Sequence, residues 1–151
     1  MKNAFIDTNV VLDYVLQREH AAEAKAVVAW LVEKKIPMMI SVGGFYTMHY
    51  IIDKYLRQTL NLSKDECNKS LRTLLTRILQ TFVVAEHDNS SLQRGVDNPD
   101  YTDLEDSCQY QLALRSGCDI LITFNDNDFT KTKDIQVITP QQFIDIYVKK
   151  K

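Results

Sequence analysis

The stretch Ala4–Leu12 constrains the fold more than any other, because it joins a short buried strand directly to the start of a helix. Its first three residues are apolar, as in a buried strand, and Thr8 and Asn9 are residue types that cap helices. Apolar residues at helical spacing follow. Asp7 therefore lies at the carboxyl end of a strand, where open α/β sheets place their ligands.

The same alternation of strand and helix continues along the chain. Further strands are predicted at residues 38–42, 82–85, 118–123 and 135–138, and helices at residues 21–34, 45–55, 63–79, 102–116 and from 139 onward. The polar stretch 86–101 is expected to be a loop with one short helical turn. Such alternation produces a parallel sheet with helices on both faces. We therefore predict a single domain over residues 1–151, a three-layer α/β/α sandwich with about five strands.

Composition excludes several classes of protein. A net charge of -2 leaves no global basic field, so a nucleic-acid partner needs a local basic patch. Candidates for such a patch are Lys54, Arg57, Arg72, Arg77 and Arg94. The three cysteines form no C-x-x-C pair, which argues against a disulfide framework or a zinc site. No apolar run reaches membrane-spanning length, so a cytoplasmic protein without membrane contact is expected.

Two stretches carry the capping-box pattern, Ser63–Glu66 and Thr102–Glu105. In the second stretch, Glu105 is expected to close the box with Thr102 and to point away from its neighbours. Asp103 and Asp106 are three residues apart and share one face of that helix.

Acidic and amide side chains occur at three places that a doubly wound sheet brings to one crevice: Asp7, the Asp103–Asp106 pair, and the turn Asn125–Asp128. Carboxylates gathered there repel one another unless a cation or protons compensate. Oxygen ligands without paired His or Cys favour Mg²⁺ or Mn²⁺ over zinc. One ion would activate water at a phosphate, and two ions would clamp the attacking and leaving oxygens. Each acid also has a structural explanation as a cap or turn residue, and only the joint arrangement favours catalysis.

The order and spacing of five segments resemble a PIN domain across nearly the whole chain. These segments are Ile6–Val10, Asp103–Asp106, Leu121–Asn125, Asp128–Phe129 and Val137–Phe143. The resemblance implies cleavage of single-stranded RNA that depends on Mg²⁺ or Mn²⁺. Many bacterial members of this size are VapC-type toxins, so an antitoxin partner and a homodimer are also implied.

Carried over by position, the implied catalytic residues are Asp7, Asp103, Asp106 and Asn125, and the implied metal ligands are Asp7, Asp103, Asp106 and Asp128. Asn125 stands where many members have Asp, and Thr123 would support that corner by hydrogen bonding. An antitoxin helix would fit the apolar helices between Phe45 and Leu79.

One departure leaves alternatives open. Family members usually carry a Glu early in the helix after the second strand, but residues 43–48 contain no acid. A PIN-like module that binds protein or RNA without cutting it is therefore an alternative. An aspartyl-phosphate phosphatase of the haloacid dehalogenase type, with Asp7 as nucleophile, is disfavoured because Asn9 stands where that chemistry needs a second Asp.

Overall fold

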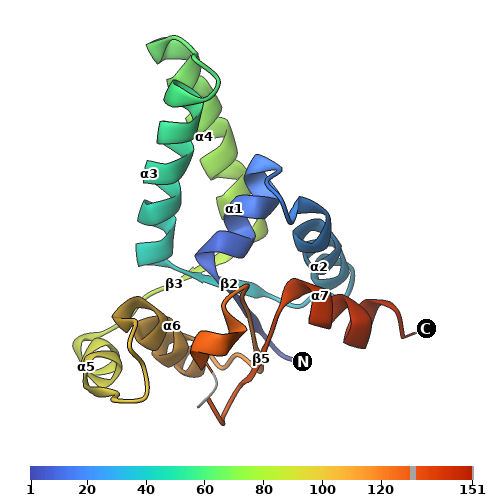
Figure 1. Cartoon of the computed structure of the whole chain (residues 1–151), viewed down its shortest axis with the longest axis vertical. Coiled ribbons are helices and arrows are strands. Elements are labelled where there is room, and N and C mark those ends of the chain that lie inside the picture. Colours follow the sequence, from blue (N-terminus) through green and yellow to red (C-terminus); the bar gives the residue numbers. More distant parts are fainter. Residues whose placement is uncertain (130–131, 151) are drawn as a thin grey trace.

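The computed structural model describes residues 1–129 and 132–150. At its centre is a five-stranded parallel sheet in the order β3-β2-β1-β4-β5 (Figure 1). The strands are β1 (Ala4–Ile6), β2 (Met38–Ser41), β3 (Val83–Ala85), β4 (Ile120–Ile122) and β5 (Gln136–Ile138). The predicted parallel sheet is confirmed.

The order of strands reverses between β1 and β4. From β1 the chain adds β2 and then β3 on one side, whereas β4 and β5 lie on the other side. Ile6 is paired with Ile122, and the amide of Asp7 donates to the Ile122 carbonyl at 3.0 Å. The carboxyl ends of β1 and β4 therefore lie side by side at the switch point, where a ligand crevice is expected.

Helices cover both faces of the sheet. They are α1 (Thr8–Leu16), α2 (Ala21–Glu33), α3 (Val42–Gln58), α4 (Lys64–Thr81), α5 (Asn89–Asp97), α6 (Leu104–Arg115) and α7 (Pro140–Phe143), with a 3-10 turn at Asp126–Phe129 and a π-helical turn at Ile144–Val148. Helices α1, α2, α3, α4 and α7 lie on one side, and α5 and α6 lie on the other (Figure 1). None of the described helices combines the length and apolar content that crossing a bilayer requires.

Alternate side chains of each strand enter two separate cores. Ile6, Ile40 and Ile120 pack with the larger helical layer, whereas Phe5 and Leu121 pack on the opposite face with α6. Both faces are buried, as the near-continuous apolar strands of a parallel sheet require.

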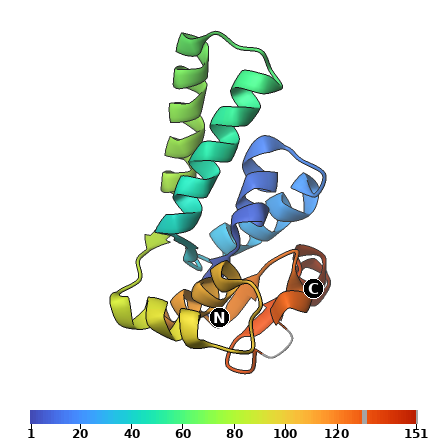
Figure 2. The same ribbon diagram turned by 60° about the vertical axis from the view of Figure 1, so that its left-hand side comes forward.

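Helices α3 and α4 form a hairpin whose far end extends well beyond the sheet (Figures 1 and 2). Met48 and Ile52 of α3 and Ile78 of α4 are fully buried in the larger core. Tyr46 and Tyr50 of α3 are instead 68% and 64% exposed, which leaves an aromatic surface on this hairpin.

The start of α3 differs from the prediction, which placed it at residue 45. The helix begins at Val42, because the Ser41 hydroxyl caps it by accepting from the Gly44 amide at 2.8 Å. A Cβ on Gly44 would lie 2.7 Å from the Thr8 hydroxyl oxygen, so only glycine permits this close approach of α3 to α1.

The stretch 86–101 also differs from the prediction, since it contains the nine-residue helix α5 rather than a single turn. Asp88 caps α5 in a capping box with Ser91. The helix packs closely on α6, where a Cβ on Gly95 would lie 2.7 Å from the Cys108 sulfur. The Ser107 hydroxyl donates to the Gly95 carbonyl at 2.7 Å, which fixes this contact.

Candidate active site

Asp7 is buried at the end of β1, with both carboxylate oxygens hydrogen-bonded. Oδ1 accepts from the Thr8 amide at 2.7 Å, and Oδ2 accepts from the Thr123 hydroxyl at 2.8 Å. Asp7 itself is therefore the cap of α1, rather than Thr8 or Asn9. Burial raises the pKa of Asp7 above its usual value, and the bonds from Thr123 and Thr8 oppose that rise.

Thr123 links Asp7 to the loop after β4. Its hydroxyl oxygen also accepts from the Asn125 amide at 3.0 Å, and the Asp128 amide donates to the Asn125 carbonyl at 2.9 Å. The predicted supporting role of Thr123 is confirmed in its geometry. This chain of bonds holds Asn125 and Asp128 beside the end of β1.

The start of α6 supplies three acids to the same place. The Asp103 carboxylate caps this helix by accepting from the Asp106 amide at 3.1 Å, so the predicted Thr102–Glu105 capping box is wrong. Asp106 is buried, and Asp103 and Glu105 are exposed. Glu105 accepts a long bond from the Gln109 amide nitrogen at 3.5 Å and faces the cavity, contrary to the prediction that it points away.

These side chains line one cavity of about 290 Å³, which we call the acidic crevice. Its acidic members are Asp7, Asp103, Glu105, Asp106 and Asp128, and its neutral members are Thr8, Asn9, Thr47, Ile51, Gln109 and Asn125. The structure thus brings together all five site residues predicted from the sequence. It adds Glu105 and Gln109. The only sequence signal for Gln109 is its helical spacing of three residues from Asp106 and four from Glu105.

The acids of the crevice interact electrostatically. The pKa of Asp106 is raised to about 7, first by burial and then by the negative charges of Asp103, Asp7, Asp128 and Glu105. A cation in the crevice would relieve this repulsion and favour the ionised form.

The donor chemistry fits Mg²⁺ or Mn²⁺, since every candidate ligand is a carboxylate or amide oxygen. Within residues 1–129 and 132–150, however, no three acidic, His or Cys side chains lie close enough together to hold an ion. Protein side chains would therefore supply only part of a coordination shell, and water or phosphate oxygens would complete it.

The wall contributed by α3 explains the shortage of ligands. Of residues 45–48, only Thr47 lines the crevice, so it occupies the place from which an acid on this helix would reach in. Its hydroxyl donates instead to the Gly43 carbonyl at 3.2 Å. Asp53, the next acid on α3, forms an ion pair with Arg57 and is absent from the crevice wall.

Comparison with known proteins agrees with this geometry. A family model described as PIN domain matches residues 3–127. The chain belongs to the PIN domain family. It is 24% identical over 148 residues to Ribonuclease VapC1 of Aquifex aeolicus (strain VF5), which covers 94% of this chain and 93% of that protein.

Two solved structures share the PIN fold of this chain. The toxin-antitoxin complex from Klebsiella pneumoniae has a chain that is 24% identical with a TM-score of 0.64, covering 91% of this chain and 98% of that one. Mycobacterium tuberculosis VapC20, titled a Sarcin-Ricin loop cleaving toxin, is 14% identical with a TM-score of 0.61, covering 89% and 98%. At these identities the likeness concerns the fold.

Proposed function

We propose that this PIN domain is a metal-dependent endoribonuclease that cleaves single-stranded RNA and acts as the toxin of a toxin–antitoxin pair. The observation that carries the proposal is the convergence of Asp7, Asp103, Asp106 and Asp128 at the sheet's switch point, with the pKa of Asp106 raised to about 7. Such a concentration of carboxylates, of which Asp7 and Asp106 are buried, is typical of a metal-assisted catalytic site. The match to a protein named ribonuclease supports the same reaction class.

In this proposal, Mg²⁺ or Mn²⁺ lies among Asp7, Asp103, Asp106 and Asp128, and water and phosphate oxygens complete the coordination shell that these side chains supply only in part. When bound, the ion polarises the phosphate and lowers the pKa of a water molecule. Asp7 cannot rotate freely, because Thr8 and Thr123 hold its two oxygens, and it therefore presents a fixed ligand. Asn125, exposed at the rim, offers amide N–H groups to a phosphate oxygen.

Conservative variants test the reaction. We expect Asp7→Asn or Asp106→Asn to abolish Mn²⁺-dependent cleavage of a labelled single-stranded RNA, because each removes one negative charge while keeping the side chain's shape. Asp65→Asn, an exposed position in the first turn of α4, is the control and should cleave normally. Cleavage at an undiminished rate by either folded crevice variant would refute the assignment.

If the wild-type protein does not bind metal and does not cut RNA, the chain is a PIN-like binding module. The neutral Thr47 and Asn125 positions are the features that such a result would explain. None of Lys54, Arg57, Arg72, Arg77 and Arg94 lines the acidic crevice, so a basic path for RNA over these residues stays a prediction.

The partner proposal concerns the α3–α4 hairpin. Tyr46, Tyr50 and Leu79 are exposed there, and an amphipathic antitoxin helix would bury them. We expect a copurifying small protein from the native host, and a dimer by size-exclusion chromatography. Tyr50→Glu should weaken the antitoxin complex, since it places a charge on that apolar surface. A monomer without any partner would contradict both expectations.

A further inference from the structure

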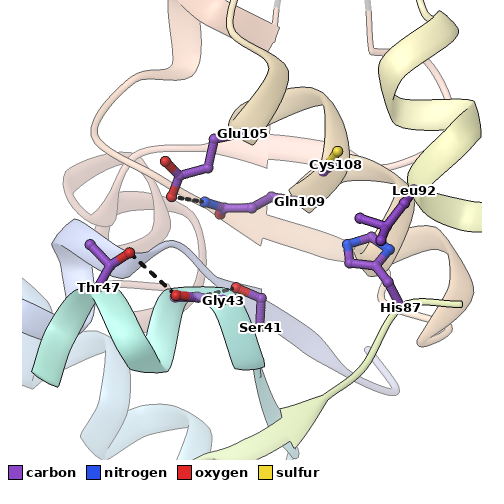
Figure 3. A pocket seen from close by; sticks show the side chains of 9 residues that line it. Ser41, Gly43, Thr47, His87, Leu92, Glu105, Cys108 and Gln109 are labelled. Atoms are coloured by element: carbon purple, nitrogen blue, oxygen red, sulfur yellow. Dashed lines mark hydrogen bonds between the residues drawn. The ribbon is translucent and has the colours of Figure 1, made fainter. Parts of the chain in front are cut away.

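A second cavity adjoins the acidic crevice, and we propose that it receives one unstacked nucleobase of the RNA strand, next to the nucleotide whose phosphate lies in the crevice. This inference rests on the proposed ribonuclease function. The cavity, which we call the flanking pocket, measures about 300 Å³ and lies between the start of α3 and the pair α5–α6 (Figure 3). Thr47, Glu105 and Gln109 line both cavities, so a strand crossing the crevice passes directly to the flanking pocket.

The flanking pocket is open at the first turn of α3. A Cβ built on Gly43 meets no atom within 4 Å, so the backbone of the first turn of α3 is accessible here. Leu92 of α5 and Cys108 of α6 add apolar walls. Both faces of a nucleobase are apolar, so the side chains of Leu92 and Cys108 are suited to pack against one of them.

His87 provides an aromatic ring at the far side of the pocket (Figure 3). Its Nδ1 lies 2.8 Å from the Ser91 hydroxyl, within the capping box of α5, so the position of the ring is fixed. Burial and the nearby Arg115 charge lower the pKa of His87, which keeps the ring neutral at neutral pH. A neutral imidazole can stack on a base or hydrogen-bond to its edge.

Gln109 supplies an unused acceptor in the wall shared by the two cavities. Its side chain is 5% exposed, and its Oε1 has no hydrogen-bond partner among the described residues. The amide nitrogen is already engaged by Glu105. An unpaired buried acceptor costs free energy, so a rotation of the Gln109 side chain that brings this oxygen to an N–H group of a bound base would be favourable.

Size and position favour a base of RNA over a helix of a protein partner. The volume is at the lower end for small-ligand pockets, which suits one base rather than a helix. Proteins read single-stranded RNA by splaying single bases into such pockets beside the backbone path. The exposed aromatic surface for a protein partner, at Tyr46 and Tyr50, is absent from the pocket wall.

The first test observes His87 directly by NMR. The chain has three histidines, so the His87 ring signals can be assigned with a His87→Gln variant. The non-cleaving Asp7→Asn protein is titrated with a short single-stranded RNA and with a series of the same RNA carrying one abasic nucleotide at each position in turn. We expect the intact RNA to shift the His87 signals and one abasic position to lose that shift. Unmoved His87 signals on RNA binding would overturn the inference.

The second test blocks the pocket. Gly43→Leu should fill the flanking pocket and abolish the RNA-dependent shift of the His87 signals. Leu92→Glu, at an exposed position in the pocket wall, should abolish the same shift without altering the first turn of α3. Val32→Glu, at an exposed apolar position on α2, is the matched control. On a randomised single-stranded RNA with Mn²⁺, the pocket variants should lower the base preference at one position beside the cut at least tenfold, while the control keeps it.

The outcomes separate the two proposals. Failure of wild-type protein to cut any RNA defeats the ribonuclease assignment, whereas the His87 shift tests the pocket without cleavage. If both pocket variants keep the base preference and the shift, the inference is wrong. If an antitoxin shifts the His87 signals and RNA does not, the pocket belongs to the protein partner and the inference is also wrong.

Discussion

Removal of one charge from the acidic crevice should stabilise the metal-free protein. Asp106 is buried at the start of α6 with its pKa raised to about 7, first by burial and then by the charges of Asp103, Asp7, Asp128 and Glu105. The unfolded chain ionises this group near its usual pKa of about 4. Asp106→Asn keeps the shape of the side chain and removes the charge, so the folded state no longer carries the cost of ionisation.

The magnitude follows from the two pKa values. Each pKa unit corresponds to about 1.36 kcal/mol, so a rise from about 4 to about 7 costs the folded state about 4 kcal/mol at pH 8. The crevice is open to water, and solvent screening reduces this to about 2 kcal/mol. For a domain of this length, that difference raises the Tm of Asp106→Asn by about 4–8 °C.

The sign of the pH dependence is fixed by the raised pKa. The folded state holds the Asp106 proton up to about pH 7, whereas the unfolded state releases it near pH 4. The cost therefore grows between about pH 4 and pH 7 and is constant above pH 7. The Tm gap between Asp106→Asn and wild type should be largest at pH 8 and less than half as large at pH 4.5.

The assay is thermal unfolding by circular dichroism in EDTA at these two pH values. Asp65→Asn, outside the crevice on α4, should change the free energy of unfolding by no more than about 0.5 kcal/mol. Saturating Mn²⁺ should stabilise wild type and narrow its gap to Asp106→Asn, since the ion supplies the missing positive charge. A lower Tm for Asp106→Asn than for wild type at pH 8 would refute the reasoning and leave Asp106 as a structural residue.

Two further predictions concern the incomplete ligand set. Asn125→Asp adds a carboxylate to the rim of the acidic crevice, so it should strengthen Mn²⁺ binding at least tenfold, measured by calorimetric titration, and lower the Tm in EDTA. Equal Mn²⁺ affinity of the variant and wild type would place Asn125 outside the metal site. Thr47→Glu should likewise strengthen Mn²⁺ binding, whereas Tyr46→Glu, one residue away and 68% exposed, should not. Equal effects of the two glutamates would show that only the added net charge matters.

The parts of the site that the sequence predicts depend on local patterns and one topological rule. Asp7 follows a three-residue apolar strand, and Asn125 follows another, so both are assigned to carboxyl ends of strands. Parallel alternation then places them at one switch point. The Asp103–Asp106 spacing gives a shared helix face without any tertiary information.

The orientation of Glu105 was not predictable, because two residues compete to cap α6. Thr102 and Asp103 are both good caps, and the structure uses Asp103. With Thr102 as the cap, Glu105 would be the third helical residue and could bond back to the amide of the cap; with Asp103 as the cap it is the second, and its side chain is instead paired with Gln109. That choice depends on how the chain enters the helix, which the sequence pattern does not reveal.

Helix α5 was missed for a different reason. It has nine residues including Gly95, too short and too poor in helix formers to be predicted from propensity. Its stability comes from packing on α6, from the bond between the Ser107 hydroxyl and the Gly95 carbonyl, and from the capping box of Asp88 and Ser91. The start of α3 was missed for a related reason. Gly43 and Gly44 disfavour a helix by propensity, and only the structure shows the Ser41 cap and the close contact of Gly44 with Thr8 that stabilise it.

The hydrogen bond between Thr123 and Asp7 joins residues that are 116 positions apart in the sequence. A chain leaving the ribosome therefore cannot hold Asp7 in its working position until β4 has been synthesised and has paired with β1. Truncated chains that end before β4 lack this hydroxyl, and with it Asn125 and Asp128. The proposed activity would accordingly begin only when most of the chain has been made.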